Sequence, residues 1–444
     1  MAPPTSTLDL TAAPLSDLLT KQTALPTASD SPAVPLTTQR PLDASLLTTT
    51  YTTSPKPYSP PTSWGGQDVT TDHWITATWS VNSGWAAPQL RPYTRTDLWP
   101  TASCLHYATE CFEGLKAYRG VDGKVRLFRP NRNTARMLIS STRIACPAFP
   151  PDQLESLITT LLATDGPKWL PDNDSFIYIR PTMIGTGRAL GVQQPREAML
   201  FIVMTLFPRL DKPMKLLASA EDSIRAWPGG FGFAKVGANY GPSLLAQKGA
   251  QMKGFDQILW LFGKEGWVTE AGASNFFVLL LEDGVKKLVT APLDDKIILD
   301  GVTRRSLLEL ARERLPGVEV VERRYTMAEL VKAHEEGRLL EAFAAGTAFF
   351  VAQVKEISFK DTTILLPLAE GSVTLTLKAS LKAIMYGEVD HEWGVVVPEV
   401  GFKEEFVDEE EIREMMEKLR ELKKSKAWMA AEERVKAEEL GEAL

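Results

Sequence analysis

Apolar residues recur with two different periods along the middle of the chain. Short apolar runs that end at turn residues predict strands, and apolar residues spaced three or four positions apart predict helices. The predicted strands cover residues 125–128, 176–180, 200–206, 258–262, 275–281 and 287–290. The predicted helices cover residues 133–143, 154–163, 242–252, 303–314, 327–336 and 375–384.

Two dipeptides in this pattern favour tight hairpins. Asp122-Gly123 precedes the strand at 125–128, and Asp283-Gly284 separates the strands at 275–281 and 287–290. Turns of this kind join antiparallel neighbours, so much of the sheet is expected to be antiparallel. Because strands and helices are mixed and no internal repeat occurs, the sequence predicts an α+β protein.

The folded body is expected to have two lobes. A polar, proline-containing stretch at 207–213 is the best internal boundary and is interpreted as a linker. It separates a smaller α/β domain at 63–206 from a larger domain at 214–400. Lobes of this length are each long enough to bury a core of their own.

The two ends of the chain differ from this body. Of the first 62 residues, 32 are Ser, Thr or Pro, 7 are charged and none is glycine. Scattered apolar residues cannot offset the entropy cost of ordering such a segment, so residues 1–62 are predicted to form a disordered tail. Residues 401–444 contain 14 acidic and 9 basic residues, with pairs such as Glu414 and Lys418 at helical spacing, which predicts a charged C-terminal helix.

Charge and composition exclude several classes of protein. With 49 basic and 56 acidic residues the net charge is -7, which argues against nucleic acid as a partner. No stretch approaches the ~18 apolar residues of a membrane helix. The three cysteines form neither a disulfide framework nor a metal cluster with histidine, so a reducing compartment and no metal are expected. The amino end resembles no secretory signal and its first arginine is Arg40, which favours the cytoplasm, with the mitochondrion as the alternative.

A lysine between glycines is the first candidate for chemistry. Lys235 lies in a segment with Gly229, Gly230, Gly232, Gly237 and Gly241, directly before a predicted helix. Glycines let backbone approach a ligand closely, and a lysine held out of water can act as a neutral amine that attacks a carbonyl group. Taken alone, Lys235 could equally be a surface-loop lysine.

A carboxylate and a helix start suggest a phosphorylated heterocycle as ligand. Glu270 ends a probable strand beside a turn of small residues, and a buried carboxylate there could keep a pyridine nitrogen protonated. The segment Gly301-Val302-Thr303 opens a helix, whose free N–H groups suit a phosphate. A hairpin end and an ordinary helix start are the plain alternatives.

Three further segments offer anion contacts. Gly346-Thr347-Ala348 supplies backbone donors and one hydroxyl at a strand edge. Arg136 on a helix and Arg180 on a strand could each bind an anion through two hydrogen bonds. A structural ion pair explains either arginine equally well when it is considered by itself.

Together and in this order, the segments resemble one family closely, the branched-chain amino acid aminotransferases, which are fold type IV pyridoxal phosphate enzymes. The resemblance covers about residues 66–398 and implies that family's two-lobed fold and a homodimer with Tyr107 near the subunit boundary. The matching segments are 105–118, 128–137, 178–181, 235–246, 269–276, 301–305 and 346–348, with Tyr386-Gly387 and His391-Glu392-Trp393-Gly394 close to its end.

The resemblance implies a role for each site residue. Lys235 would carry pyridoxal phosphate covalently and move the substrate's α-proton, and Glu270 would pair with the pyridine nitrogen. The other cofactor contacts would be Tyr240 at the ring hydroxyl and Arg136, the backbone at Val302 and Thr303, and Thr347 at the phosphate. The substrate contacts would be Tyr178 and the amides of Thr347 and Ala348 at the α-carboxylate, Arg180 at the second carboxylate of glutamate, and Tyr107, Phe112 and Tyr240 around an apolar side chain.

The chain also departs from the family pattern. Ala238 stands where the family usually has a second glycine, and Ala273-Ser274 stand where Thr-Met is frequent, so a hydroxyl near the substrate is lost. Phe349 and Ala352 replace the C-x-x-C of the animal mitochondrial members, so that thiol switch is absent.

The resemblance implies transfer of an amino group from leucine, isoleucine or valine to 2-oxoglutarate, in two half-reactions. Such an enzyme binds small-molecule substrates and neither nucleic acid nor membrane. An aminodeoxychorismate lyase and a D-amino acid aminotransferase share the fold and are the alternatives. A catalytically silent binding or scaffold protein is a further one, and the presence of both Lys235 and Glu270 argues against it.

Overall fold

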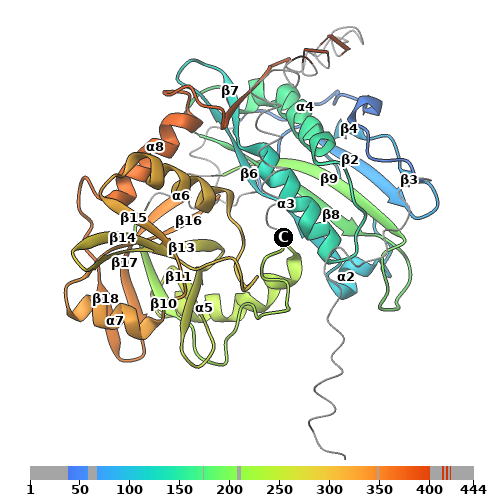
Figure 1. The fold of residues 1–444 in the computed structure, drawn as a ribbon. Coiled ribbons are helices and arrows are strands. Elements are labelled where there is room, and N and C mark those ends of the chain that lie inside the picture. The colour runs from blue at the N-terminus through green and yellow to red at the C-terminus, as the bar shows by residue number, and fades with distance from the viewer. Residues whose placement is uncertain are drawn as a thin grey trace, which may run out of the picture. The chain divides into compact units, whose positions relative to one another are not determined.

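The computed structural model describes residues 39–58, 68–173, 175–207, 212–347 and 350–400, with 413, 414, 417, 418 and 421, and in them the chain builds two large sheets (Figure 1). No helix among these residues is long and apolar enough to span a membrane. The sheets are mainly antiparallel, and parallel pairs are confined to β1–β4, β10–β11, β10–β17 and β14–β15 in the described ranges. The predicted α+β class with largely antiparallel sheets is therefore confirmed.

The first sheet has the strand order β1-β4-β2-β9-β8-β6-β7-β19, with β3 on β2 and β5 on β8. Helices α3 (Pro130–Arg143) and α4 (Pro151–Trp169) lie across it and bury an apolar core, and the short helix α2 (Ser103–Tyr107) precedes β5. Its strands are β1 (Thr48–Thr49), β2 (His73–Ser80), β3 (Gly84–Trp85), β4 (Gln89–Pro92), β5 (Glu110–Phe112), β6 (Leu115–Arg119), β7 (Val125–Phe128), β8 (Ile177–Gly185), β9 (Glu197–Leu206) and β19 (Gly394–Val397).

The second sheet has the order β12-β11-β10-β17-β16-β13-β14-β15, with β18 on β17. Its strands are β10 (Met214–Ala218), β11 (Gln257–Phe262), β12 (Trp267–Ala271), β13 (Ser274–Glu282), β14 (Val285–Thr290), β15 (Val318–Glu322), β16 (Leu339–Gly346), β17 (Phe350–Phe359) and β18 (Thr362–Leu365). Its helices are α5 (Leu244–Met252), α6 (Val302–Arg314), α7 (Met327–Glu335) and α8 (Val373–Met385). The short 3-10 helices are η1 (Ala44–Leu46), which packs on the first sheet's core, η3 (Gly237–Asn239) and η4 (Gly241–Ser243).

The elements expected from periodicity are present. All six predicted strands and all six predicted helices occur, with most ends within three residues of the expected bounds, while α4 and β8 extend beyond their predicted ends at 163 and 180 to Trp169 and Gly185. The turn between β13 and β14 has Asp283 at φ 52° and Gly284 at φ 79°, the left-handed pair that a two-residue hairpin requires. Short strands such as β3 and β5 were missed, because two or three residues carry no periodic signal.

The predicted tail is wrong for residues 39–58. Arg40 pairs with Gly84, η1 follows, and β1 pairs with β4 in parallel. Leu42 and Ala44 are buried in the core of the first sheet. Composition predicted disorder because apolar residues are few. In residues 39–58, called the strap below, these few suffice, because Leu47 and Tyr51 also pack on that core and the sheet supplies backbone partners. The remaining part of the predicted tail lies mostly outside the described residues.

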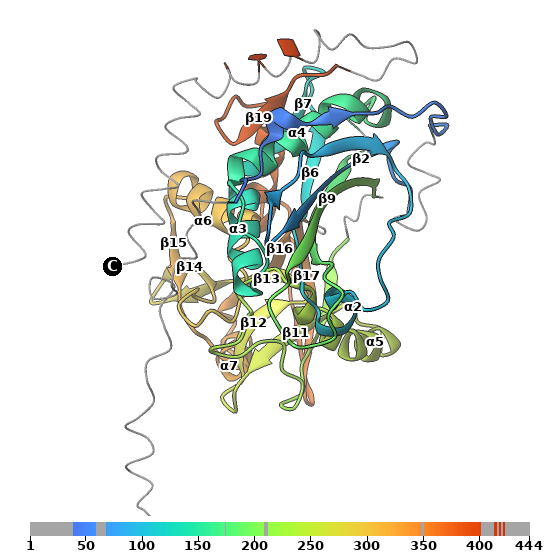
Figure 2. The same cartoon turned by 90° about the vertical axis from the view of Figure 1, so that its right-hand side faces the viewer.

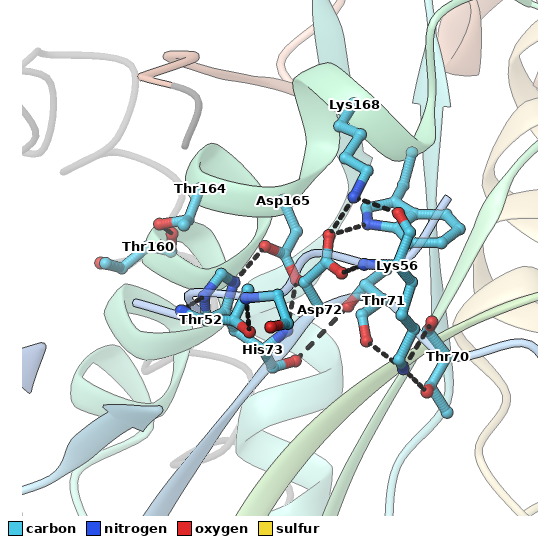
Figure 3. Close-up of polar contacts among 12 residues, drawn as sticks. Thr52, Lys56, Thr70, Thr71, Asp72, His73, Thr160, Thr164, Asp165 and Lys168 are labelled. Atoms are coloured by element: carbon cyan, nitrogen blue, oxygen red, sulfur yellow. Dashed lines mark hydrogen bonds and ion pairs between the residues drawn. The ribbon is translucent and has the colours of Figure 1, made fainter. Parts of the chain in front are cut away.

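A polar network fastens the strap to β2 and α4 (Figure 3). The Lys56 N–H donates to Asp72 Oδ1 at 2.7 Å, and Lys168 Nζ donates to both Asp72 Oδ2 and the Lys56 carbonyl oxygen. One turn earlier on α4, Asp165 Oδ1 lies 2.7 Å from Nδ1 of the buried His73, whose Nε2 accepts from the Thr52 N–H. The strap is thus held by charged side chains as well as by the sheet.

The boundary between the sheets falls near the predicted linker. β9 ends at Leu206 and β10 begins at Met214, while 208–211 lie outside the described residues. The late segment Gly394–Val397 returns to the first sheet as β19 and pairs with β7 (Figure 2). Most of the predicted C-terminal helix also lies outside the described residues, although Glu414 and Lys418 form the expected pair at 3.8 Å.

Candidate active site

The segment that carries Lys235 runs antiparallel to β5. The Phe112 N–H donates to the Lys235 carbonyl oxygen at 3.0 Å, and Cys111 pairs with Val236. The Lys235 N–H donates to Ser140 Oγ of α3 at 2.8 Å. The backbone of the lysine is therefore fixed by two elements of the first sheet's layer.

The Lys235 amine lies among aromatic rings. Nζ is 3.0 Å from the Tyr240 hydroxyl and 4.8 Å from the centre of the Phe112 ring, and the two rings are 5.1 Å apart. In the described part of the chain, no carboxylate lies within ion-pair distance of Nζ. A half-buried amine whose close polar contact is a phenol is available for chemistry in a way that an ion-paired lysine is not.

Glu270 is buried and held by three partners. Oε2 lies 2.9 Å from Arg225, and Oε1 accepts from the Leu299 N–H at 2.8 Å and from Asn275 Nδ2 at 3.3 Å. Arg225 was missed by sequence reasoning because a single arginine in an irregular loop carries no motif. Its contact fixes the direction of the carboxylate.

Arg136 forms a buried ion pair with Glu113. Nε and Nη2 of Arg136 donate to the two Glu113 oxygens at 2.7 and 2.9 Å. Burial alone would raise the pKa of Glu113, but the guanidinium charge and its hydrogen bonds hold that pKa below its usual value. Sequence reasoning gave Glu113 no role, although it lies in one of the matched segments.

The same arginine reaches the start of α6. Arg136 Nη1 donates to the Asp300 carbonyl oxygen at 2.8 Å. The N-cap of α6 is Gly301, which has no side chain to accept from the first N–H groups, at Val302 and Thr303. A Cβ on Gly301 would lie 2.1 Å from Asn275 Oδ1, so only glycine fits there. An uncapped helix start beside a guanidinium favours an anion.

Arg180 lies on β8 next to Phe112. Its Nη2 donates to the Tyr178 hydroxyl at 3.1 Å, and its guanidinium carbon is 4.7 Å from the Phe112 ring centre. Tyr178 stacks on Phe207 at 4.5 Å. Nε of Arg180 is buried and has no hydrogen-bond partner among the described residues. A buried guanidinium donor without a partner indicates a position where a ligand carboxylate would bind.

Two predicted residues have no contact with the lysine in the described ranges, and a third lies outside them. Tyr107 is exposed on α2, and its hydroxyl donates to the Leu190 carbonyl oxygen. Thr347 directly follows β16, and within the described ranges no contact joins it to Lys235. Ala348 lies outside the described residues. The structure thus assembles Lys235, Tyr240, Phe112, Tyr178 and Arg180 in one group, and Arg136, Val302 and Thr303 in a second.

The chain is similar to branched-chain amino acid aminotransferases both in its family profile and in its sequence relatives. The profile of the amino-transferase class IV family matches residues 110–357. The mitochondrial branched-chain-amino-acid aminotransferase of Schizosaccharomyces pombe is 42% identical over 80% of this chain and 86% of its own length. The cytosolic enzyme of Saccharomyces cerevisiae is 42% identical over 82% of this chain and its whole length. The named relatives therefore include both of the locations that the sequence left open.

Solved structures agree with these relatives. The T.th. branched-chain amino acid aminotransferase complexed with N-(5'-phosphopyridoxyl)-L-glutamate superposes with a TM-score of 0.58 at 26% identity. The match covers 72% of this chain and 98% of that one. The branched-chain aminotransferase of Thermoproteus uzoniensis, solved with norvaline, has the same TM-score at 22% identity and supports the fold alone.

Proposed function

Because this chain belongs to the class IV aminotransferases, we propose that it is a pyridoxal phosphate-dependent branched-chain aminotransferase that converts leucine, isoleucine or valine and 2-oxoglutarate into 2-oxo acids and glutamate. The observation that carries the proposal is the Lys235 amine, which contacts the Tyr240 hydroxyl and no carboxylate among the described residues. A lysine in that setting can bond to an aldehyde.

The described residues fit pyridoxal phosphate. Lys235 would attach it, with Tyr240 at the ring hydroxyl. Glu270, held in place by Arg225, would accept a hydrogen bond from the ring nitrogen. The phosphate would be held by Arg136, by the N–H groups of Val302 and Thr303 at the uncapped start of α6, and by Thr347. When bound, the cofactor supplies an electron sink for the electrons released at the substrate's Cα.

The side chains around Lys235 each have a distinct task. Lys235 Nζ takes the proton from the substrate's Cα, and the Tyr240 hydroxyl at 3.0 Å directs the amine. Phe112 and Tyr240 shield the amine from water and offer an apolar surface to a branched side chain. Arg225 and two N–H donors hold the Glu270 carboxylate in place.

The two carboxylates of glutamate would bind to neighbouring groups at one end of this surface, since Arg180 donates to the Tyr178 hydroxyl. The α-carboxylate would meet Tyr178 and the amides of Thr347 and Ala348. The second carboxylate of glutamate would meet Arg180, whose buried Nε has no partner in the described ranges. One arginine in an otherwise apolar surface lets glutamate and leucine use the same site.

We also propose a homodimer with Tyr107 near the subunit boundary. Exposed apolar residues gather around it, namely Trp99, Leu105, Leu190 and Val192, and the last is 88% exposed. The Tyr107 hydroxyl on Leu190 ties α2 to the loop that carries two of them. An apolar patch of this kind favours burial against another protein surface. Light scattering should give about twice the chain mass of 49.0 kDa, and a fully active monomer would contradict the proposal.

The experiment that tests the function is a half-reaction screen. The purified protein is mixed with single L- and D-amino acids, and the visible absorbance of the bound cofactor is followed. L-leucine, L-isoleucine, L-valine and L-glutamate should each convert the absorbance to that of the pyridoxamine form. Borohydride reduction and peptide mapping should label Lys235. Conversion by D-amino acids only, or release of pyruvate from aminodeoxychorismate, would favour the alternative enzymes.

A further inference from the structure

Glu110 lies on the same face of the first sheet as the candidate site. Opposite residues of antiparallel segments point to the same side, and neighbours in a strand point to opposite sides. Phe112 lies opposite Lys235, and Cys111 lies opposite Val236, where both are fully buried in the core. Glu110 therefore lies opposite Gly237 and points to the side of Phe112 and away from the core.

The carboxylate of Glu110 covers Gly237. Its Oε2 would lie 2.9 Å from a Cβ on that glycine, and its carboxyl carbon 3.0 Å away. A larger residue at 237 would have to push this carboxylate aside. Across the residues that the structure describes, the Glu110 carboxylate has no hydrogen bond or ion pair. An unpaired negative charge is therefore held two residues from Lys235.

Pairing with β8 shows in which order Glu110, Phe112 and Arg180 lie along this face. Glu110 lies opposite Ile184 and Phe112 opposite Thr182, so Arg180 follows on the same side. At ~3.3 Å per residue, Arg180 and Glu110 stand at opposite ends of a row roughly 13 Å long. The Phe112 ring lies between them, with the Arg180 guanidinium carbon at 4.7 Å. The face is positive at one end, apolar in the middle and negative at the other.

We propose that Glu110 is a specificity-determining residue, whose negative charge disfavours substrates with an acidic side chain and so shifts the enzyme towards neutral branched side chains. The inference rests on the proposed function, because it concerns the choice between glutamate and leucine at the same site. Glutamate carries one more negative charge than leucine, so Glu110 repels glutamate more. Arg180 and Glu110 then set the balance between the two substrates from opposite ends of the face.

The test compares Glu110→Gln with wild type. Glutamine keeps the size of the side chain over Gly237 and removes its charge. The kcat/KM for L-glutamate should rise roughly two- to threefold, as expected for one charge at about 12 Å in a partly hydrated site, while that for L-leucine changes less than about 1.5-fold. The gain should shrink in 0.5 M salt, at a Debye length of roughly 4 Å. Glu110→Asp keeps the charge, so its ratio of kcat/KM for glutamate to kcat/KM for leucine should equal that of wild type.

Asp361→Asn is the matched control. Asp361 is exposed in the turn that joins β17 to β18, at the far end of β17 from Thr347, and this variant removes the same formal charge. The ratio of its kcat/KM for glutamate to its kcat/KM for leucine should equal that of wild type. An unchanged ratio in Glu110→Gln, or an equal change in Asp361→Asn, would overturn the inference while both substrates still react. A wild-type protein that transaminates neither amino acid would instead overturn the proposed function and the inference with it.

Discussion

Two polar regions of this molecule are built from the same kinds of residue and differ in how completely they are satisfied. In the network under the strap, Lys168 meets Asp72 at 2.7 Å and His73 meets Asp165 at 2.7 Å. In the candidate site, Lys235 meets only a phenol and two rings, and a buried nitrogen of Arg180 has no partner among the described residues.

The hydrogen bonds of His73 show how completely the polar groups of the first region are paired. Its Nε2 accepts from the Thr52 N–H, so the ring proton must lie on Nδ1, where it donates to Asp165. Both ring nitrogens of His73 therefore have a hydrogen-bond partner. A closed network of this kind stabilises the fold, whereas donors left without partners in a buried setting are available to a ligand. Lys235 and Arg180 carry such donors, whereas Glu270 and Arg136 each have a charged partner of their own in the described residues.

The largest expected effect is a contrast between two lysines. Lys235→Met should abolish turnover and change the free energy of unfolding by less than about 1 kcal/mol, because the amine has no ion pair to lose. Lys168→Met should lower the free energy of unfolding and leave kcat/KM within about twofold of wild type. The measurements are steady-state kinetics and urea unfolding of both variants. Residual turnover in Lys235→Met, or inactivation by Lys168→Met, would erase the distinction between the regions.

Glu270→Gln is the next largest effect. In the proposed function Glu270 pairs with the cofactor's ring nitrogen, and an amide would not keep that nitrogen protonated, so turnover should fall about a hundredfold or more, which corresponds to ~2.7 kcal/mol of barrier. The pH dependence of the bound cofactor's absorbance should shift as well. Near-normal kinetics would show that Glu270 is held by Arg225 for structural reasons alone.

Arg180→Met tests the unpartnered donor. A charge-assisted contact with the second carboxylate contributes ~2 to 3 kcal/mol, so kcat/KM for glutamate and 2-oxoglutarate should fall roughly thirty- to a hundredfold. Leucine should be affected much less, because its side chain has no carboxylate. Single-turnover rates for both amino acids decide the matter, and equal losses would assign Arg180 to the shared α-carboxylate or to the fold.

Asp72→Asn tests the closed region in the same way. Asp72 accepts from the Lys56 N–H, Lys168 Nζ and Trp169 Nε1, and an amide would turn a donor towards one of these donors. The free energy of unfolding should fall by about 2 kcal/mol, with kcat/KM unchanged. Asp361→Asn, in an exposed turn, is the control and should stay within about 0.5 kcal/mol of wild type.

The smallest expected effect is the pH dependence of the difference in unfolding free energy between wild type and Asp72→Asn. Burial alone would raise the pKa of Asp72, but the hydrogen bonds from Lys168, Lys56 and Trp169 lower it below 3.8. A lowered pKa in the folded state contributes stability above the unfolded pKa, and that stability is lost as the pH falls through the folded value. The gap between wild type and Asp72→Asn in urea unfolding should therefore be present at pH 7 and close below about pH 3.8. A gap that persists in acid would assign it to packing.

The sequence by itself determined the local elements and the candidate chemistry. Helices such as α3 and strands such as β7 follow from the period of apolar residues, because that period reflects which face of the element meets the core. The Asp283-Gly284 turn follows from the left-handed backbone that those residues tolerate. The glycine-flanked Lys235 and the order of the motifs indicated the family, which the comparisons confirmed.

The tertiary structure alone decided which distant residues meet. Arg225 reaches Glu270, the strap at 39–58 enters the first sheet's core, and Glu110 covers Gly237 although 127 positions separate them (237 − 110). None of these contacts has a local signature. Each depends on strand register and on the packing of segments that are far apart in the sequence. Both are set only when the sheets assemble and exclude water from the buried groups.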